Sequence, residues 1–221
     1  MGEIPRRSHG GRAGSPGSWS GVSDGVLRGI AHQLSNRTGT IGAVAEALAA
    51  SDDSSSNLTQ ALRGEAAKLE ELLRLLRLMP RDQGRGPEPV RPVDVVGDAL
   101  ALFAHHPVGH HSIPTLDRVE QLPPVRVHVP AFTHAVLLLL VAAAGPDGSP
   151  VTVRGGGDQR QARLALAGPG AVDSGAGWFA REATAILAAD GGSVVAHDSD
   201  PDGGPGPAFV ILLPALRPGR D

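Results

Sequence analysis

The chain has 221 residues, of which 41% are hydrophobic and 19% charged, and its net charge is −3. These values fit a soluble globular protein of one or two small domains. The absence of Cys excludes a disulfide framework, a zinc–thiolate site, an iron–sulfur cluster and a cysteine nucleophile. The balance of 20 basic against 23 acidic residues, with 3% aromatics, argues against a nucleic-acid partner.

The two chain ends offer little to bury. Residues 1–21 consist mainly of Gly, Ser, Pro and Arg, which predicts a disordered arm and no sensor domain ahead of the first helix. Residues 217–221 are a short polar tail. The longest apolar run, residues 135–144, is shorter than the roughly 20 residues that span a membrane, so we expect no membrane partner and a cytoplasmic location.

Residues 22–79 show helical periodicity in two segments. The first apolar stripe runs to about residue 50 and comprises Leu27, Ile30, Leu34, Ile41, Val44 and Leu48. After a polar turn, the second stripe comprises Leu58, Leu62, Ala66, Leu69, Leu72 or Leu73, and Leu76, and it stops at Met79-Pro80. This pattern predicts an antiparallel helical hairpin. Two helices cannot bury both stripes, so we expect a homodimer whose hairpins pair into a four-helix bundle.

Residues 80–92 form a linker rich in Pro, Gly and Arg, and residues 93–216 form a second domain. Helices are expected at 93–104, 132–144 and 178–189. Strands are expected at 112–116, 125–129, 151–154, 162–167, 193–196 and 208–213, with a hairpin around 155–158 and a loop at 202–206. Helices on one face of a mostly antiparallel sheet make an α/β sandwich, so the chain as a whole belongs to the α+β class.

His32 lies inside the first predicted helix but off its apolar stripe. It is two residues from both Ile30 and Leu34, about 200° around the helix, so its imidazole is expected to face solvent. Arg28 and Asn36 share its face, and Gly29, nearly one turn earlier, leaves the ring uncovered. An exposed imidazole can carry a phosphoryl group on a ring nitrogen and pass it to a carboxylate, although most surface histidines do no such chemistry.

The segment from His32 to Asn36 (HQLSN) resembles the phosphoacceptor box of two-component sensor histidine kinases, which reads His, Glu or Asp, Leu, any residue, then Asn or Thr. The hairpin resembles the dimerisation and phosphotransfer domain of that family. Residues 93–214 resemble its ATP-binding domain in the order and spacing of four segments: 164–170 (LALAGPG, the G1 box), 175–177 (GAG, the G2 box), 186–192 (ILAADGG) and 209–214 (FVILLP).

Several residues that serve ATP in this family are replaced here. The resemblance places Leu138 and Ala142 where the family has Asn for Mg²⁺, Leu166 where it has the adenine-binding Asp, and Phe179 at the third glycine of the G2 box. No Asn follows Asn57, and Leu and Ala offer no hard oxygen ligand. Gln33 stands where an acidic residue helps to activate the histidine. The second domain therefore resembles a degenerate histidine-kinase ATPase domain in which ATP binding is lost.

The resemblance implies a stand-alone histidine phosphotransferase of a bacterial phosphorelay. His32 would carry phosphoryl between response-regulator receiver domains, with Mg²⁺ supplied only by the receiver and no cofactor or metal of its own. Asn36 would position water for hydrolysis of the phosphorylated regulator. The contacts with the receiver would come from Arg28, Gly29, Gln33 and Arg37.

Other functions stay open at this point. The chain could be a non-catalytic pseudokinase that binds a kinase or a regulator, or a true kinase with an unusual nucleotide site. A phosphatase function would use the same surface and Asn36. A cluster of histidines (His105, His106, His110 and His111) could bind a transition metal, but no carboxylate or Cys completes it, so a solvated loop is the alternative. His128, His134 and His197 have no supporting spacing.

Overall fold

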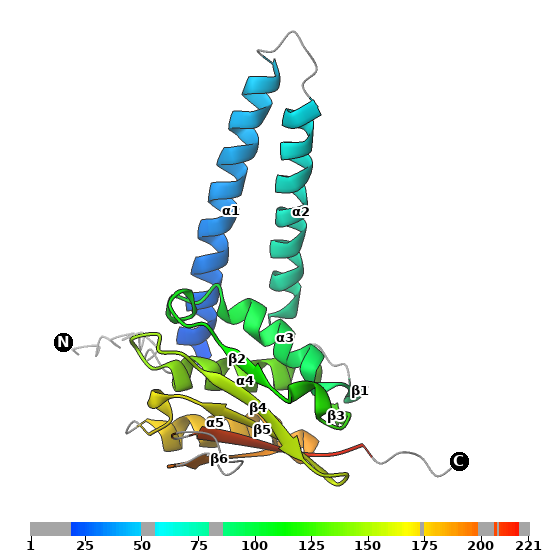
Figure 1. Cartoon of the computed structure of the whole chain (residues 1–221), viewed down its shortest axis with the longest axis vertical. Helices are drawn as coiled ribbons and strands as arrows, with labels where there is room; N and C mark the ends of the chain where they lie inside the picture. Colours follow the sequence, from blue (N-terminus) through cyan, green and yellow to red (C-terminus); the bar gives the residue numbers. More distant parts are fainter. Residues whose placement is uncertain are drawn as a thin grey trace, which may run out of the picture.

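The computed structural model describes residues 19–49, 56–79, 86–172, 175–198, 206 and 208–216. Two long helices, α1 (Trp19–Ala49) and α2 (Ser56–Leu78), form an antiparallel hairpin that projects from an α+β domain (Figure 1). The predicted hairpin is confirmed. Residues 1–18 of the expected arm, 80–85 of the expected linker and the whole expected tail lie outside the described residues, and residues 19–21 belong to α1 rather than to the arm.

The second domain contains a five-stranded sheet in the order β2-β4-β5-β7-β6. Its strands are β2 (Thr115–Asp117), β4 (Thr152–Gly157), β5 (Gln161–Ala167), β6 (Ser193–His197) and β7 (Ala208–Pro214). Only β2 and β4 pair in parallel; the other neighbours are antiparallel. The mostly antiparallel sheet is therefore confirmed.

A two-stranded ribbon corrects the expected linker. Strand β1 (Glu88–Val90) pairs antiparallel with β3 (Val125–Val127). The sequence placed residues 88–92 in the linker because Pro and Gly surround them. Pro89 is tolerated because β1 lies at the edge of a short ribbon, where one missing N–H donor costs little. Pro92 then supplies the first turn of α3, a position that suits its fixed φ.

Helices α4 (Val129–Ala144) and α5 (Ala176–Leu187) pack on the sheet, and α3 (Pro92–Phe103) packs on α4. Short 3₁₀ turns lie between the helices and strands at η1 (Val108–His110), η2 (Val119–Gln121), η3 (Pro169–Val172) and η4 (Ala188–Asp190). Every residue of α4 from 135 to 144 is buried. A helix that is apolar on all sides belongs inside the core, and α4 lies between α3 and α5.

One continuous core joins the base of the hairpin to the second domain. It includes Val22, Val26 and Ile30 of α1 and Leu72, Leu75 and Met79 of α2, together with α3, α4 and the inner face of the sheet. Beyond Ile30, α1 has no fully buried residue. The hairpin is thus anchored at one end and extends away from the domain at the other (Figure 1).

The predicted stripes are partly wrong at this base. Leu27 is 42% exposed, whereas Val26 and Leu75, which lie outside the predicted stripes, are buried. Of the alternatives Leu72 and Leu73, Leu72 is buried and Leu73 is 49% exposed. On α2, Ala66 is exposed and the neighbouring Glu65 is buried. Near the base, packing against the second domain decides which side of each helix is covered, and at Glu65 the contact with Arg37 of α1 does so. Periodicity within a single helix indicates neither contact.

Candidate functional site

His32 lies half a turn beyond Ile30, the last buried residue of α1. Its side chain is exposed, as predicted. The amide nitrogen Nδ2 of Asn36, one turn further along, lies 3.2 Å from the imidazole Nε2. The two side chains are neighbours because residues i and i+4 share one face of a helix. The site therefore places an exposed imidazole and a carboxamide side by side, just beyond the buried base of α1.

The residues expected to contact a receiver occupy different environments. Arg28 is exposed on the outer face of α1, and Gln33 is half-buried. Within the described part of the chain, the Gln33 side chain makes no hydrogen bond, so it does not hold the imidazole. Arg28 and Gln33 remain beside His32, while Gly29 and Arg37 are engaged inside the molecule.

Gly29 packs against the loop that follows α3. A Cβ at this position would overlap the backbone carbonyl oxygen of His105. Gly25, one turn earlier, faces the His106 ring, whose Cδ2 would lie 2.5 Å from a Cβ. The two glycines let α1 touch this loop, so Gly29 fixes the helix to the second domain. The sequence argument that it merely uncovers the imidazole missed this contact.

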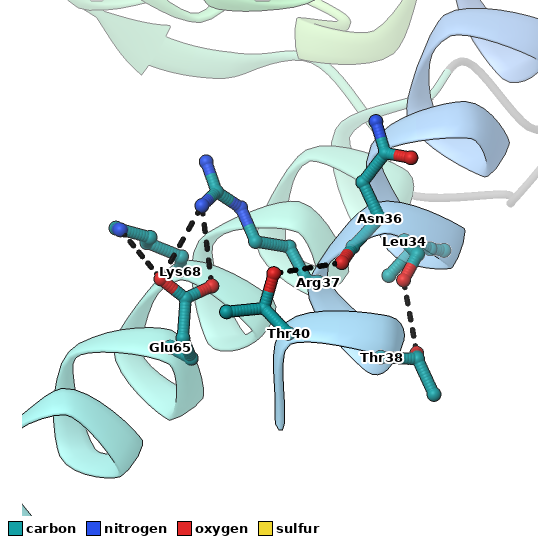
Figure 2. Close-up of polar contacts among 7 residues, drawn as sticks. All are labelled: Leu34, Asn36, Arg37, Thr38, Thr40, Glu65 and Lys68. Atoms are coloured by element: carbon teal, nitrogen blue, oxygen red, sulfur yellow. Dashed lines mark hydrogen bonds and ion pairs between the residues drawn. The ribbon is translucent and has the colours of Figure 1, made fainter. Parts of the chain in front are cut away.

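Arg37 bridges the two helices of the hairpin. Its Nη1 donates to both carboxylate oxygens of Glu65 on α2, at 3.1 and 3.3 Å, and Lys68 Nζ donates to Glu65 Oε1 at 2.7 Å (Figure 2). The Glu65 side chain is 10% exposed. The hydrogen bond from Lys68, followed by that from Arg37, lowers the pKa of Glu65. Sequence reasoning missed Glu65, whose only signal was Lys68 three residues later.

The positions compared with an ATP site are apolar and closely packed. Leu138 and Leu166 are fully buried, and Ala142 is almost so. In the segment 168–170, added Cβ atoms at Gly168 and Gly170 would overlap the carbonyl oxygens of Ala143 and Ala142. The backbone of this segment therefore lies directly on the end of α4. Phe179 packs edge-on against the Trp178 ring, with 5.0 Å between the ring centroids.

The histidine-rich loop is neither a metal cluster nor a simple solvated loop. His106 is buried beneath α1, and its Nδ1 accepts a hydrogen bond from the backbone N–H of Val108 at 3.2 Å. Burial, followed by repulsion from His110, lowers the pKa of both His105 and His106. His110 and His111 are exposed. No group of three metal-ligating side chains forms among the residues that the structure describes.

Two other histidines take part in the packing of α4. His128 donates from its backbone N–H to Asp190 Oδ2 at 2.9 Å, and its Nδ1 lies 2.6 Å from Asp190 Oδ1. The Asp190 side chain is 1% exposed, so this pair joins the start of α4 to the turn after α5. The two residues are 62 positions apart, so no local sequence pattern predicts the contact. Burial lowers the pKa of His134, within α4, to about 4.

No protein-family model matches the chain, and no curated protein matches it in sequence. Among solved structures, the mycobacterial sensor histidine kinase MprB is 23% identical, with 60% of this chain and 99% of that one covered and a TM-score of 0.43. The Acinetobacter baumannii histidine kinase AdeS is 18% identical, with 84% and 98% covered and a TM-score of 0.43.

A complex of the histidine kinase ThkA with the response regulator protein TrrA is also similar. It is 11% identical, with 85% of this chain and 60% of that one covered, and the TM-score is 0.44. In the described part of the chain, no helix combines the length and apolar character needed to cross a membrane.

Proposed function

We propose that this protein is a histidine phosphotransferase of a two-component phosphorelay. One observation carries the proposal: an exposed His32, within a sequence that resembles the phosphoacceptor box, lies beside Asn36 on a helix with an anchored base. An unprotonated ring nitrogen of His32 would attack the phosphorus of a receiver phosphoaspartate, and the bond from phosphorus to the carboxylate oxygen would break. The reverse reaction would load a second receiver.

The receiver would supply the aspartate and its Mg²⁺, and this chain would supply the docking surface. Arg28 and Gln33 line the surface of α1 around His32. Gly29 holds α1 against the loop at 105–106, so that loop lies beside the docking surface. Arg37 would act indirectly, because its guanidinium already holds α2 through Glu65.

The second domain would work without ATP. Leu138, Ala142 and Leu166 place hydrocarbon where a nucleotide and its Mg²⁺ need polar ligands. The shared core also ties the base of α1 to α3 and α4. A kinase must bring its nucleotide to the histidine, and such an anchored domain is poorly suited to that movement.

The distal hairpin supports a homodimer. Its apolar residues are half-buried in a single chain: Leu34, Ile41, Val44, Leu48, Leu58, Leu62 and Leu69. Gly39 and Gly42 of α1 and Gly64 of α2 have open space where a side chain would lie. A second hairpin packed on this surface would bury the exposed part of both stripes and complete a four-helix bundle.

A second candidate is a pseudokinase that binds a kinase or a regulator and carries no phosphoryl group. The observation in its favour is that Gln33, at the position of the activating acid, has no hydrogen bond to the imidazole. If binding is the whole function, His32 is dispensable.

Labelled phosphoryl transfer separates these functions. A panel of phosphorylated receiver domains, and separately labelled ATP, would be incubated with the wild type, His32→Ala and His110→Ala, the last being a control at another exposed histidine. Transfer from a receiver to the wild type and to His110→Ala, but not to His32→Ala, supports the phosphotransferase. Direct labelling by ATP contradicts the account of the second domain. Receiver binding that survives in His32→Ala without any labelling of the wild type favours the pseudokinase.

A further inference from the structure

The loop that follows α3 packs against the base of α1 (Figure 1). An added Cβ at Gly29 would overlap the carbonyl oxygen of His105, and one at Gly25 would lie 2.5 Å from both Cδ2 and Nε2 of the His106 ring. One edge of this ring therefore occupies the space that a side chain at position 25 would fill. His106 is 8% exposed, so α1 and the loop shield the ring from water.

The other edge of the His106 ring reports its protonation state. The backbone N–H of Val108 points at Nδ1, with 3.2 Å between the two nitrogens. A backbone N–H can only donate, so Nδ1 is the acceptor and carries no proton. His106 is therefore neutral in this packing, with its proton on Nε2. A second proton would have to bind at Nδ1, where it would meet the Val108 N–H and remove the hydrogen bond.

We propose that the loop at 105–111 is an acid-sensitive latch on α1, which opens when His106 takes up a proton from solvent and loses its bond from Val108. Opening separates the loop from Gly25 and Gly29. The buried residues of α1 keep that helix in the shared core, so the latch opens without unfolding of the domain. The latch does not depend on the proposed function, because no phosphoryl group takes part in it.

The pH range follows from the environment of His106. Burial, followed by repulsion from His110, lowers the pKa of His106 below its ordinary value of 6.5. In the open loop the ring regains a pKa near that value, so the open loop binds the proton more tightly. The latch therefore keeps its full stability above pH 6.5 and loses it as the pH falls below 6.5.

His105, the other buried histidine of the loop, does not open it. Burial and then His110 lower its pKa, while Glu71 of α2 acts in the opposite direction. Within the described residues its Nδ1 is buried without a hydrogen-bond partner, so protonation there breaks no bond in the loop. The other charged or titratable side chains on the elements around the loop are exposed or ion-paired: Asp24 and Arg28 of α1, Arg74 of α2, Asp98 of α3, His111 and Asp147.

Hydrogen exchange of the Val108 amide tests the latch, because this N–H is the donor to His106. The intrinsic rate divided by the observed rate gives the protection of the amide. Between about pH 7.5 and about pH 5.5, protection in the wild type should fall by up to about tenfold, the limit that one proton sets. His106→Asn should keep its protection, since an Asn side-chain oxygen accepts from the N–H two residues later and does not titrate. His111→Asn, at an exposed histidine, is the control and should behave as the wild type.

Three results overturn the latch. The first is unchanged protection of Val108 in the wild type, and the second is an equal loss in His106→Asn. The third is an equal loss at the buried amides of α4, which would mean that the whole domain opens. His105→Asn should retain the loss at Val108, and its disappearance there would assign the proton to the wrong ring. His110→Ala removes a repulsion and raises the pKa of His106, so its loss should be smaller; a larger loss contradicts the latch.

Transfer from a phosphorylated receiver tests the consequence for the proposed function. The latch contacts Gly29, three residues before His32, beside the proposed docking surface. From about pH 7.5 to about pH 5.5, transfer to His106→Asn should fall by up to about tenfold less than transfer to the wild type. Comparison of the two proteins cancels the effects of acid on His32 and on phosphohistidine. An equal fall contradicts an effect of the latch on docking. Exchange that follows the latch, without transfer to either protein from any receiver, supports the latch and contradicts the proposed function.

Discussion

The base of the hairpin is buried in the core of the second domain, whereas its distal part is only half-buried. At the base, Val22, Val26 and Ile30 are sealed into the core of the second domain. Distally, the apolar residues are half-buried, and the polar cluster around Glu65 joins the two helices. His32 lies at the boundary, just beyond Ile30. A side chain at such a boundary combines a fixed backbone with an open approach, which the proposed phosphoryl transfer would need.

The largest expected effect separates two leucines of α2 that are two residues apart. Leu75 is 2% exposed and Leu73 is 49% exposed. Leu75→Ala should lower the free energy of unfolding by about 2–5 kcal/mol because it opens a cavity in the base. Leu73→Ala should change it by no more than about 0.5 kcal/mol. Urea unfolding followed by circular dichroism measures both. A large cost at Leu73 would mean that a second copy covers this face.

A Gly→Ala substitution should lower the stability of the protein at one position of α1 and raise it at another. Gly29→Ala forces a Cβ onto the His105 carbonyl and should destabilise the protein by about 1–3 kcal/mol. Gly39→Ala meets no atom within 4 Å and should stabilise it by about 0.5–1 kcal/mol, since Ala favours a helix interior. Thermal unfolding of both variants gives the comparison. If Gly39→Ala weakens a dimer instead, the distal helices approach closely at that point.

The base should also lose stability on mild acidification. The folded protein holds the pKa of His106 below its ordinary value of 6.5, chiefly through burial. As the pH falls through 6.5, the unfolded chain takes up a proton that the folded chain refuses, so stability falls in that window. His106→Gln should reduce the slope of the unfolding free energy against pH below 6.5, and the remaining slope should come from His105 and His134, whose pKa values are also lowered by burial. His111→Gln, at an exposed site, is the control and should leave the slope unchanged.

The contribution of the distal ion pairs to stability should be lost only at lower pH, and this is the smallest of the expected effects. The pKa of Glu65 is lowered from 4.5 by Lys68 and Arg37, so its contribution is complete above 4.5 and is lost as the pH falls through the folded pKa. Glu65→Gln should therefore lower stability at neutral pH and match the wild type in acid. Glu70→Gln, at an exposed position of the same helix, is the control. A difference that persists in acid would mean that Glu65 acts through packing.

Local patterns predicted most elements because their causes are local. The helical periods, the end of α2 before Met79-Pro80 and the short apolar runs of β5 and β7 are features of each segment by itself. The exposure of His32 follows from its angle to Ile30 and Leu34. The contact of Asn36 follows from i, i+4 spacing. These features need no knowledge of a distant partner.

The tertiary structure decided what depends on distant segments. In the folded chain Val26 is buried while Leu27 is exposed, and Gly29 packs against the backbone of His105. His128 pairs with Asp190. Residues 88–90, which were expected in the linker, form a strand that pairs with β3. The physical reason is the same each time. A helix or a turn sets the direction of its own side chains, but which of those directions is buried depends on the segment that packs against it.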